Sequence, residues 1–180
     1  MTPEALSAVR AMLVTFEQNR PYMYLDPGGV VTVGIGIALF DRSDAFVLGG
    51  ESACDNWDFV HALPAGMVDV WYSRQSGWRG QPDALEALFE RRLAKTEADL
   101  LAQFPDLADW PVPAQVTTYD VAWNCGSELL HHWPHLSAAL KAHDWQEASE
   151  QCATRGGPAM RNDARKAAFL SCLTSAAPSA

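Results

Sequence analysis

The stretch from Tyr22 to Gly36 reads YMYLDPGGVVTVGIG and decides how the N-terminal part of the chain folds. Apolar and aromatic residues stand on both sides of a Pro-Gly-Gly sequence at positions 27–29, which is typical of two strands joined by a turn. We therefore predict a β-hairpin with a loose loop, followed by a third short strand.

A helix is predicted directly before this hairpin. Thr2 suits the N-cap and Pro3 the first helical position, and Pro21 marks the end of the helix. Apolar residues recur at helical spacing: Leu6, Val9, Leu13 and Phe16. Glu17 then falls in the last turn, where the negative end of the helix dipole disfavours a carboxylate. Because such departures from local preference tend to mark functional sites, Glu17 is a candidate site residue.

Most of the remaining chain is predicted to be helical. Residues 40–80 contain glycines, a proline and several tryptophans, so we expect short helices and loops there. Residues 83–104 open with a capping box and continue with an apolar stripe, which predicts one long helix. Further helices are predicted at residues 114–125 and 137–141, from Asp144 to a stop at Gly156-Gly157, and at residues 162–173.

The composition of the 180 residues is that of one globular domain. Hydrophobic residues make up 48% of the chain and charged residues 19%, values that exclude a disordered or collagen-like protein. Thirteen Lys and Arg stand against 22 Asp and Glu, which gives a net charge of -9. This balance argues against nucleic acid and against an anionic membrane surface as partners, because both are bound through clustered basic residues.

No targeting or membrane-spanning segment is predicted. The N-terminus lacks the basic and apolar regions of a signal peptide. The most apolar run, residues 30–40, is shorter than the roughly 20 residues that cross a bilayer. We expect the protein to be made in soluble form in the cytoplasm, so that action at a cell wall would depend on another delivery route.

The cysteines and histidines do not predict a metal site. The four cysteines, at positions 54, 125, 152 and 172, lack the Cys-x-x-Cys spacing of a zinc site. They are interpreted as buried thiols or as a disulfide between Cys152 and Cys172, which lie on consecutive predicted helices. His131, His132 and His135 surround a Trp-Pro sequence without a neighbouring carboxylate or cysteine ligand pattern, so we prefer a surface loop.

Three residues with catalytic chemistry follow one another around the hairpin. Eight residues separate Glu17 from Asp26, and five separate Asp26 from Thr32. With this spacing and its glycines, the segment resembles the phage-type lysozymes, the muramidase endolysins of glycoside hydrolase family 24. The similarity covers roughly three-quarters of the chain. It continues through four further segments: residues 83–101, 123–126, 144–148 and 161–165.

The resemblance implies an α+β, lysozyme-like fold in a single domain of residues 1–180. A small N-terminal lobe with the hairpin, residues 1–80, would be joined by a long helix, residues 83–104, to a larger helical C-terminal lobe, residues 105–175. The substrate would bind in a cleft between the lobes.

The resemblance also implies which residues carry the chemistry. Glu17 would be the general acid that protonates the departing sugar oxygen, whereas ionised Asp26 and the hydroxyl group of Thr32 would position the attacking water. The reaction would invert the anomeric carbon, which requires about 6.5–9.5 Å between the two carboxyl groups. Taken singly, each residue has an ordinary explanation, as a solvated charge, a turn residue and a strand residue.

Other residues are assigned to the substrate by the same resemblance. Asn124 would hydrogen-bond the saccharide or cap its helix, Trp123 would line the cleft or fill the core, and Gly36 would lie at the substrate site. Aromatic faces suit sugar rings, so the tryptophans of residues 40–80 are further candidates: Trp57, Trp71 and Trp78.

The sequence departs from the family pattern in three places. Gln18 follows Glu17 where relatives usually have glycine, and Ile37 follows Gly36 where they often have a histidine that supports an ion pair. Residues 40–80 form an insert that is longer than expected and would cover the cleft, bind a partner or narrow the choice of substrate.

The resemblance predicts hydrolysis of the β-1,4 bond between N-acetylmuramic acid and N-acetylglucosamine in peptidoglycan, by a monomer without metal or organic cofactor. The role would be that of an endolysin or of an injected antibacterial effector with an inhibitory immunity protein. Alternatives are a non-catalytic peptidoglycan-binding module of the same fold and a chitin-type glycosidase. Because a net charge of -9 gives no long-range attraction to the anionic cell wall, recognition should depend on short-range contacts.

Overall fold

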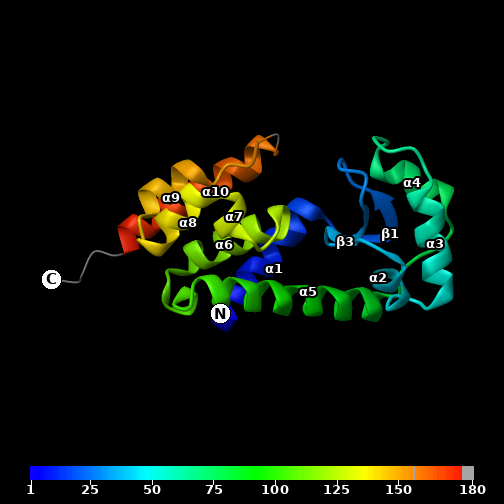
Figure 1. Ribbon diagram of the computed structural model, residues 1–180, viewed down its shortest axis with the longest axis horizontal. Helices are drawn as coiled ribbons and strands as arrows, with labels where there is room; N and C mark the ends of the chain where they lie inside the picture. The colour runs from blue at the N-terminus through cyan, green and yellow to red at the C-terminus, as the bar shows by residue number, and fades with distance from the viewer. Residues whose placement is uncertain (156, 176–180) are drawn as a thin grey trace. The chain divides into compact units, whose positions relative to one another are not determined.

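The computed structural model describes residues 1–155 and 157–175 (Figure 1). The chain is helix-rich with one small antiparallel sheet, which agrees with the predicted α+β class. By their contacts the residues fall into two compact units. The sheet unit comprises Glu17–Ala94, and the helical unit comprises Met1–Phe16 with Lys95–Ala180.

The sheet unit is built on the predicted hairpin and third strand, which are confirmed. The strands pair antiparallel in chain order: β1 (Arg20–Leu25), β2 (Val31–Gly34) and β3 (Ile37–Leu39). The hairpin closes at Asp26, whose N–H donates to the Val30 carbonyl and whose carbonyl accepts from the Gly29 N–H, both at 2.9 Å. This register sets Thr32 directly opposite Tyr24.

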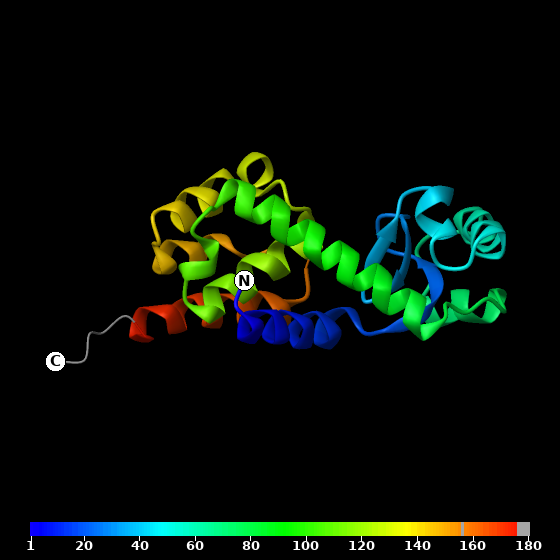
Figure 2. The ribbon, with the colours of Figure 1, turned by 90° about the horizontal axis from the view of Figure 1, so that it is seen from below.

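Between β3 and the long helix the chain forms short helices, as predicted: α2 (Arg42–Phe46), α3 (Glu51–His61) and α4 (Asp69–Gln75). Asp41 caps α2 by accepting hydrogen bonds from the N–H groups of Ser43 and Asp44. Both α3 and α4 pack against β1 and lie beside it in both views (Figure 1, Figure 2). Val60 of α3 and Tyr72 of α4 are fully buried there.

The long helix predicted at residues 83–104 is confirmed as α5 (Pro82–Gln103), which contributes residues to both units. The predicted capping box is wrong, because the helix already begins at Pro82 and Asp83 lies inside its first turn. Its apolar stripe is buried, with Leu88, Phe89 and Leu93 each at most 3% exposed. Within the described part of the chain, no helix has both the length and the apolar composition needed to cross a membrane.

The helical unit contains these further elements: α1 (Pro3–Glu17, whose last residue belongs to the sheet unit), η1 (Leu107–Asp109), α6 (Val112–Cys125), α7 (Leu129–His132), α8 (Pro134–Lys141), α9 (Trp145–Gln151) and α10 (Ala159–Ser175). The predicted caps of α1 and α9 are confirmed. Thr2 Oγ1 accepts the N–H of Ala5 at 3.2 Å, and Asp144 Oδ1 accepts that of Glu147 at 3.0 Å.

Several boundaries in this unit differ from the prediction. α6 begins at Val112 rather than at residue 114, and α9 ends at Gln151 rather than at residues 156–157. The helix predicted at residues 137–141 already begins at Pro134, because proline fits the first turn and the Trp133 carbonyl accepts the N–H of Ser137 at 2.8 Å. The last helix begins at Ala159 rather than at residue 162.

The core of the helical unit surrounds α6, whose residues 114–122 are all buried. The rings of Trp110, Trp145 and Phe169 pack next to it. Their centres are separated by 5.5 Å between the tryptophans and by 6.2 Å between Trp145 and Phe169. Large aromatic side chains of this kind dominate the apolar area that a small domain buries.

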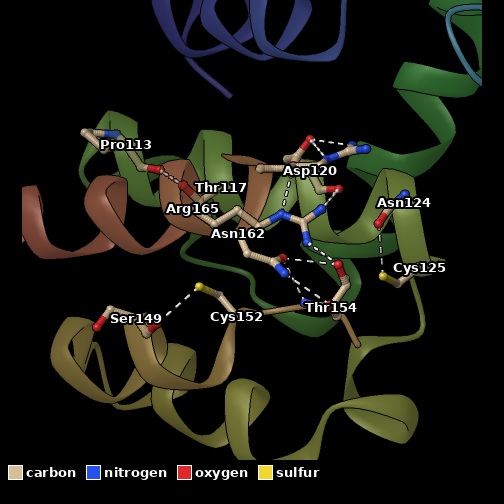
Figure 3. Close-up of polar contacts among 11 residues, drawn as sticks. Pro113, Thr117, Asp120, Asn124, Cys125, Ser149, Cys152, Thr154, Asn162 and Arg165 are labelled. Carbon is tan, nitrogen blue, oxygen red and sulfur yellow. Dashed lines mark hydrogen bonds and ion pairs between the residues drawn. The ribbon is translucent and has the colours of Figure 1, made fainter. Parts of the chain in front are cut away.

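All four cysteines are free thiols. Cys54, Cys152 and Cys172 are buried, so the interpretation as buried thiols is confirmed for these three. Cys152 Sγ donates to the Ser149 carbonyl at 3.3 Å (Figure 3), and Cys172 Sγ donates to the Ala168 carbonyl at 3.4 Å. The Cys152–Cys172 disulfide is wrong, because each thiol bonds a carbonyl a few residues earlier in its own segment.

Candidate functional site

Glu17 is the last residue of α1 and is half-buried. The next residue, Gln18, has φ 58°, the left-handed conformation that ordinarily favours glycine. This is the position at which the sequence lacks the glycine usual in the phage-type lysozymes, yet the chain still makes the turn. Nη1 of Arg20 donates to the Glu17 carbonyl oxygen and thereby satisfies one of the carbonyl groups left open at a helix end.

The turn between β2 and β3 brings Gly36 against the Glu17 side chain. Gly36 has φ +65°, and a Cβ atom at this position would lie 2.7 Å from Glu17 Oε2 and 2.8 Å from its carboxyl carbon. Such a distance is too short for any side chain, so glycine is what allows the backbone to approach the carboxyl group. The structure therefore brings together two of the predicted site residues.

Asp26 stands at the end of β1 and is half-buried. Its Oδ1 accepts the N–H of Val30 at 2.8 Å, which fixes the carboxyl group across the mouth of the hairpin loop. Gly28 lies beside it, and a Cβ atom there would be 3.3 Å from Asp26 Oδ1. The predicted ordinary role as a turn residue is thus present, and the loop holds this carboxylate in one orientation.

Thr32 is buried in the middle of the sheet and is only 4% exposed. Its hydroxyl donates to the Val30 carbonyl at 3.1 Å, which leaves the oxygen lone pairs as acceptors. Val30 therefore bonds both Asp26 and Thr32, through its N–H and its carbonyl respectively. The backbone of Val30 therefore holds two of the three candidate catalytic side chains.

Tyr24, a buried residue of β1, was not among the predicted site residues. The pKa of Tyr24 is raised to about 12, mainly by burial; the Arg20 charge opposes this shift, and the negative charges of Glu17, Asp26 and Asp69 add to it. The carboxylates of Glu17 and Asp26 therefore both act on one phenol, which lies opposite Thr32 in the sheet. Tyr24 lies two residues before Asp26 in the sequence, a spacing that could have drawn attention to the tyrosine.

Arg20 and Asp69 form an ion pair within the sheet unit that the sequence did not predict. Nε of Arg20 donates to Asp69 Oδ2, and the guanidinium carbon lies 5.0 Å from the centre of the Tyr24 ring. The two residues are 49 positions apart and join β1 to the first residue of α4. Local periodicity carries no information about a pair so distant in sequence.

The other two predicted substrate residues, Trp123 and Asn124, belong to the helical unit. Asn124 is exposed near the end of α6, and its Oδ1 accepts a long hydrogen bond from the Cys125 thiol at 3.7 Å (Figure 3). It does not cap the helix, because Gly126 with φ 92° takes that position. Trp123 is half-buried, which is intermediate between the two roles considered for it.

The three tryptophans of the insert are all half-buried. Trp57 Nε1 donates to the Leu39 carbonyl at 3.0 Å, and its ring stacks on His61 with 4.7 Å between centres. Trp71 packs edge-on against Tyr72 at 5.2 Å. The rings of Trp57 and Trp71 therefore pack against other residues of the insert.

A concave pocket of about 430 Å³ lies elsewhere in the sheet unit. It contains none of the predicted site residues. Its lining combines apolar side chains with one amide and two carboxylates: Asn19, Pro21, Gly34, Ile35, Gly80, Pro82, Asp83, Leu85, Glu86 and Phe89. Its lining residues Asn19 and Ile35 are close in sequence to Glu17 and Gly36.

His131, His132 and His135 are exposed, as predicted, but the predicted surface loop is wrong, because the first two lie on α7 and His135 on α8. Among the described residues, no group of three or more His, Cys, Asp or Glu side chains is arranged to hold a metal ion.

No protein-family model matches the chain, and no curated protein is significantly similar to it. An assignment of function therefore depends on the geometry of the sheet unit together with the spacing of its motif.

Proposed function

We propose that the protein is a glycoside hydrolase that cleaves the β-1,4 bond between N-acetylmuramic acid and N-acetylglucosamine in peptidoglycan. The observation that carries the proposal is the close approach of Gly36 to the Glu17 carboxyl group, in the same unit as a hairpin where Val30 bonds both Asp26 and Thr32. The same residues carry the motif of the phage-type lysozymes, and the mixed fold is compatible with a lysozyme-like architecture.

The proposed mechanism uses the two carboxyl groups differently. Glu17 donates its proton to the glycosidic oxygen as the bond to the anomeric carbon breaks. Asp26 remains ionised, stabilises the positive charge that develops on the sugar ring, and with the Thr32 oxygen orients the attacking water. The water proton passes to Asp26, and the product has inverted configuration. No metal or organic cofactor takes part in these steps.

Two features support a fixed geometry for this reaction. Asp26 is held by the Val30 N–H, and Glu17 is confined between Gly36 and the end of its helix. Preorganised groups of this kind lower a barrier because they need no reorientation when the charge develops. The net charge of -9 does not draw the protein to an anionic wall, so binding should rest on contacts at the site.

Replacing Glu17 with Gln tests the assignment most directly. We expect the variant to fold and to release no muropeptides from purified peptidoglycan, because the amide has no proton to donate to the leaving group. Mass spectrometry of the digest reports the bond that is cleaved, and NMR of fresh product reports the anomeric configuration. Glu4→Gln is a matched control, because Glu4 is exposed in the first turn of the same helix.

Undiminished release by the Glu17→Gln variant would overturn the assignment of the acid. Binding to peptidoglycan without any cleavage by the wild-type protein would favour a non-catalytic binding module. Cleavage of chitin oligomers in preference to peptidoglycan would favour a chitin-type enzyme. The biological role, as an endolysin or as an effector delivered to a rival's periplasm with an immunity protein, is a separate part of the proposal and depends on the delivery route.

A further inference from the structure

The insert of residues 40–80 reaches the candidate site through α4, whose first residue is Asp69. Asp69 Oδ2 accepts hydrogen bonds from Nε of Arg20 and, at 3.4 Å, from the hydroxyl of Tyr22. Both donors lie on β1, the strand that leads to Asp26. The insert is therefore tied by a side-chain contact to the strand that carries the site.

The same guanidinium group makes two contacts with the candidate site. Its Nη1 donates to the Glu17 carbonyl, and its carbon lies 5.0 Å from the centre of the Tyr24 ring. The Arg20 side chain is only 18% exposed, so little water competes for these contacts. A planar guanidinium presents its donors in a rigid fork and can also lie against a ring, whereas the ammonium group of a lysine is a compact point charge without this planar geometry.

Electrostatics strengthen this arrangement. Burial alone would raise the pKa of Asp69, but hydrogen bonds from Arg20 and from the Val70 N–H, together with the Arg20 charge, hold it below its ordinary value. Burial alone would likewise lower the pKa of Arg20, and its interactions with Asp69 and the Tyr24 phenol raise it instead. Both partners are thus charged over the whole neutral range of pH.

We propose that Arg20 is a positioning residue for Glu17 and that α4, through Asp69, holds Arg20 in place. The insert would then set the geometry of the general acid rather than cover the substrate or bind a partner. Without Asp69 the guanidinium loses the carboxylate that fixes its plane, and its bond to the Glu17 carbonyl loses its orientation. This inference rests on the proposed muramidase function.

The test compares kcat and KM on purified peptidoglycan for Arg20→Met, Arg20→Lys and Asp69→Asn. The matched control is Arg42→Met, because Arg42 belongs to the same insert and pairs with Glu51 and Asp58 of α3. We expect Arg20→Met to lower kcat about 10- to 100-fold, since small displacements of catalytic groups have effects of this size. Arg20→Lys and Asp69→Asn should lower kcat less, KM should change by about twofold or less in all variants, and Arg42→Met should retain wild-type kcat.

A double variant distinguishes positioning of Glu17 through Arg20 from a general loss of rigidity in the sheet unit. If Asp69 acts only through Arg20, adding Asp69→Asn to Arg20→Met lowers kcat no further, whereas independent effects would multiply. Thermal unfolding of every variant checks that the fold is intact, and Asp69→Asn, at a side chain 31% exposed, keeps the test open if Arg20→Met does not fold.

The inference is overturned if Arg20→Met and Asp69→Asn lower kcat no more than Arg42→Met does while Glu17→Gln is inactive. In that case the proposed function stands without it. Activity in Glu17→Gln would overturn the proposed function itself, so the two failures are distinguishable.

Discussion

Each unit contains an arginine–aspartate cluster, and the two clusters differ in burial. In the helical unit, Asp120 of α6 accepts hydrogen bonds from Arg161 and Arg165 of α10, and none of the three side chains is more than 4% exposed (Figure 3). In the sheet unit, Arg20 and Asp69 keep 18% and 31% of their side-chain surface exposed. The first cluster is part of a core, whereas the second lies beside half-buried candidate catalytic groups.

The charged side chains of the buried cluster make several hydrogen bonds each. Arg165 bonds Asp120 Oδ2 at 2.6 Å and also reaches the Asp120 carbonyl and Thr154 Oγ1, at 3.3 and 3.4 Å. Thr154 is in turn fixed by Asn162, whose Oδ1 accepts the Thr154 N–H at 3.0 Å (Figure 3). A charge that is buried away from water is stable only when it is paired and hydrogen-bonded in this way. The hydrogen bonds of the cluster also link α6, α10 and the segment between α9 and α10. The comparison predicts that losing a partner costs stability in the helical unit and catalytic geometry in the sheet unit.

The largest expected effect is on the buried cluster. Asp120→Asn should lower the free energy of unfolding by about 3–5 kcal/mol, because two buried guanidinium groups would share no counter-charge. Asp69→Asn makes the same chemical change at a half-exposed pair and should cost about 0–1 kcal/mol. Urea unfolding followed by circular dichroism measures both, and equal losses would remove the distinction between the clusters.

The second effect concerns activity in the sheet unit. Gly36→Ala should lower kcat about tenfold or more, because the new Cβ atom would displace the Glu17 carboxyl group from its position. Gly66→Ala is the matched control for backbone strain, since Gly66 also has positive φ, +81°, but has no other atom within 4 Å of the added carbon. Kinetics on purified peptidoglycan compare the two, and an equal loss in both would show that strain alone, rather than contact with Glu17, lowers the rate.

Much of the fold follows from local signals in the sequence. Thr2 and Asp144 predict helix starts because their side chains bond neighbouring backbone groups. The Pro-Gly-Gly sequence at residues 27–29 predicts the hairpin because proline and glycine favour the backbone conformations of a turn. These interactions are local, so no knowledge of the tertiary structure is needed.

The candidate site was predictable only in part. The spacing of Glu17, Asp26 and Thr32 identified side chains, but the position of Gly36 against Glu17 depends on how β2 turns into β3. Arg20 and its partner Asp69 escaped prediction because the pair forms only after the insert folds back onto β1. Contacts across long sequence separations are set by packing, and packing leaves no periodic signal in one sequence.

The smallest expected effect concerns the pH dependence of the half-exposed pair. The pKa of Asp69 in the folded protein is below its ordinary value, so the ionised carboxylate stabilises the fold. That contribution is fully present above the unfolded pKa of about 3.9 and is lost as the pH falls through the lower folded value. The difference in unfolding free energy between wild type and Asp69→Asn should therefore stay constant from about pH 7 to pH 5 and shrink below about pH 4.

Urea unfolding of both proteins across this range measures the difference, and Tyr22 does not interfere because its pKa is raised above an already high value, by burial first and then by the Asp69 charge. A difference that grew on acidification would mean that the Asp69 carboxylate destabilises the fold. The half-exposed pair would then resemble neither a weak surface contact nor the buried cluster. If the difference vanishes at acidic pH while kcat at neutral pH still depends on Asp69, the pair contributes little stability and acts mainly on the position of Glu17.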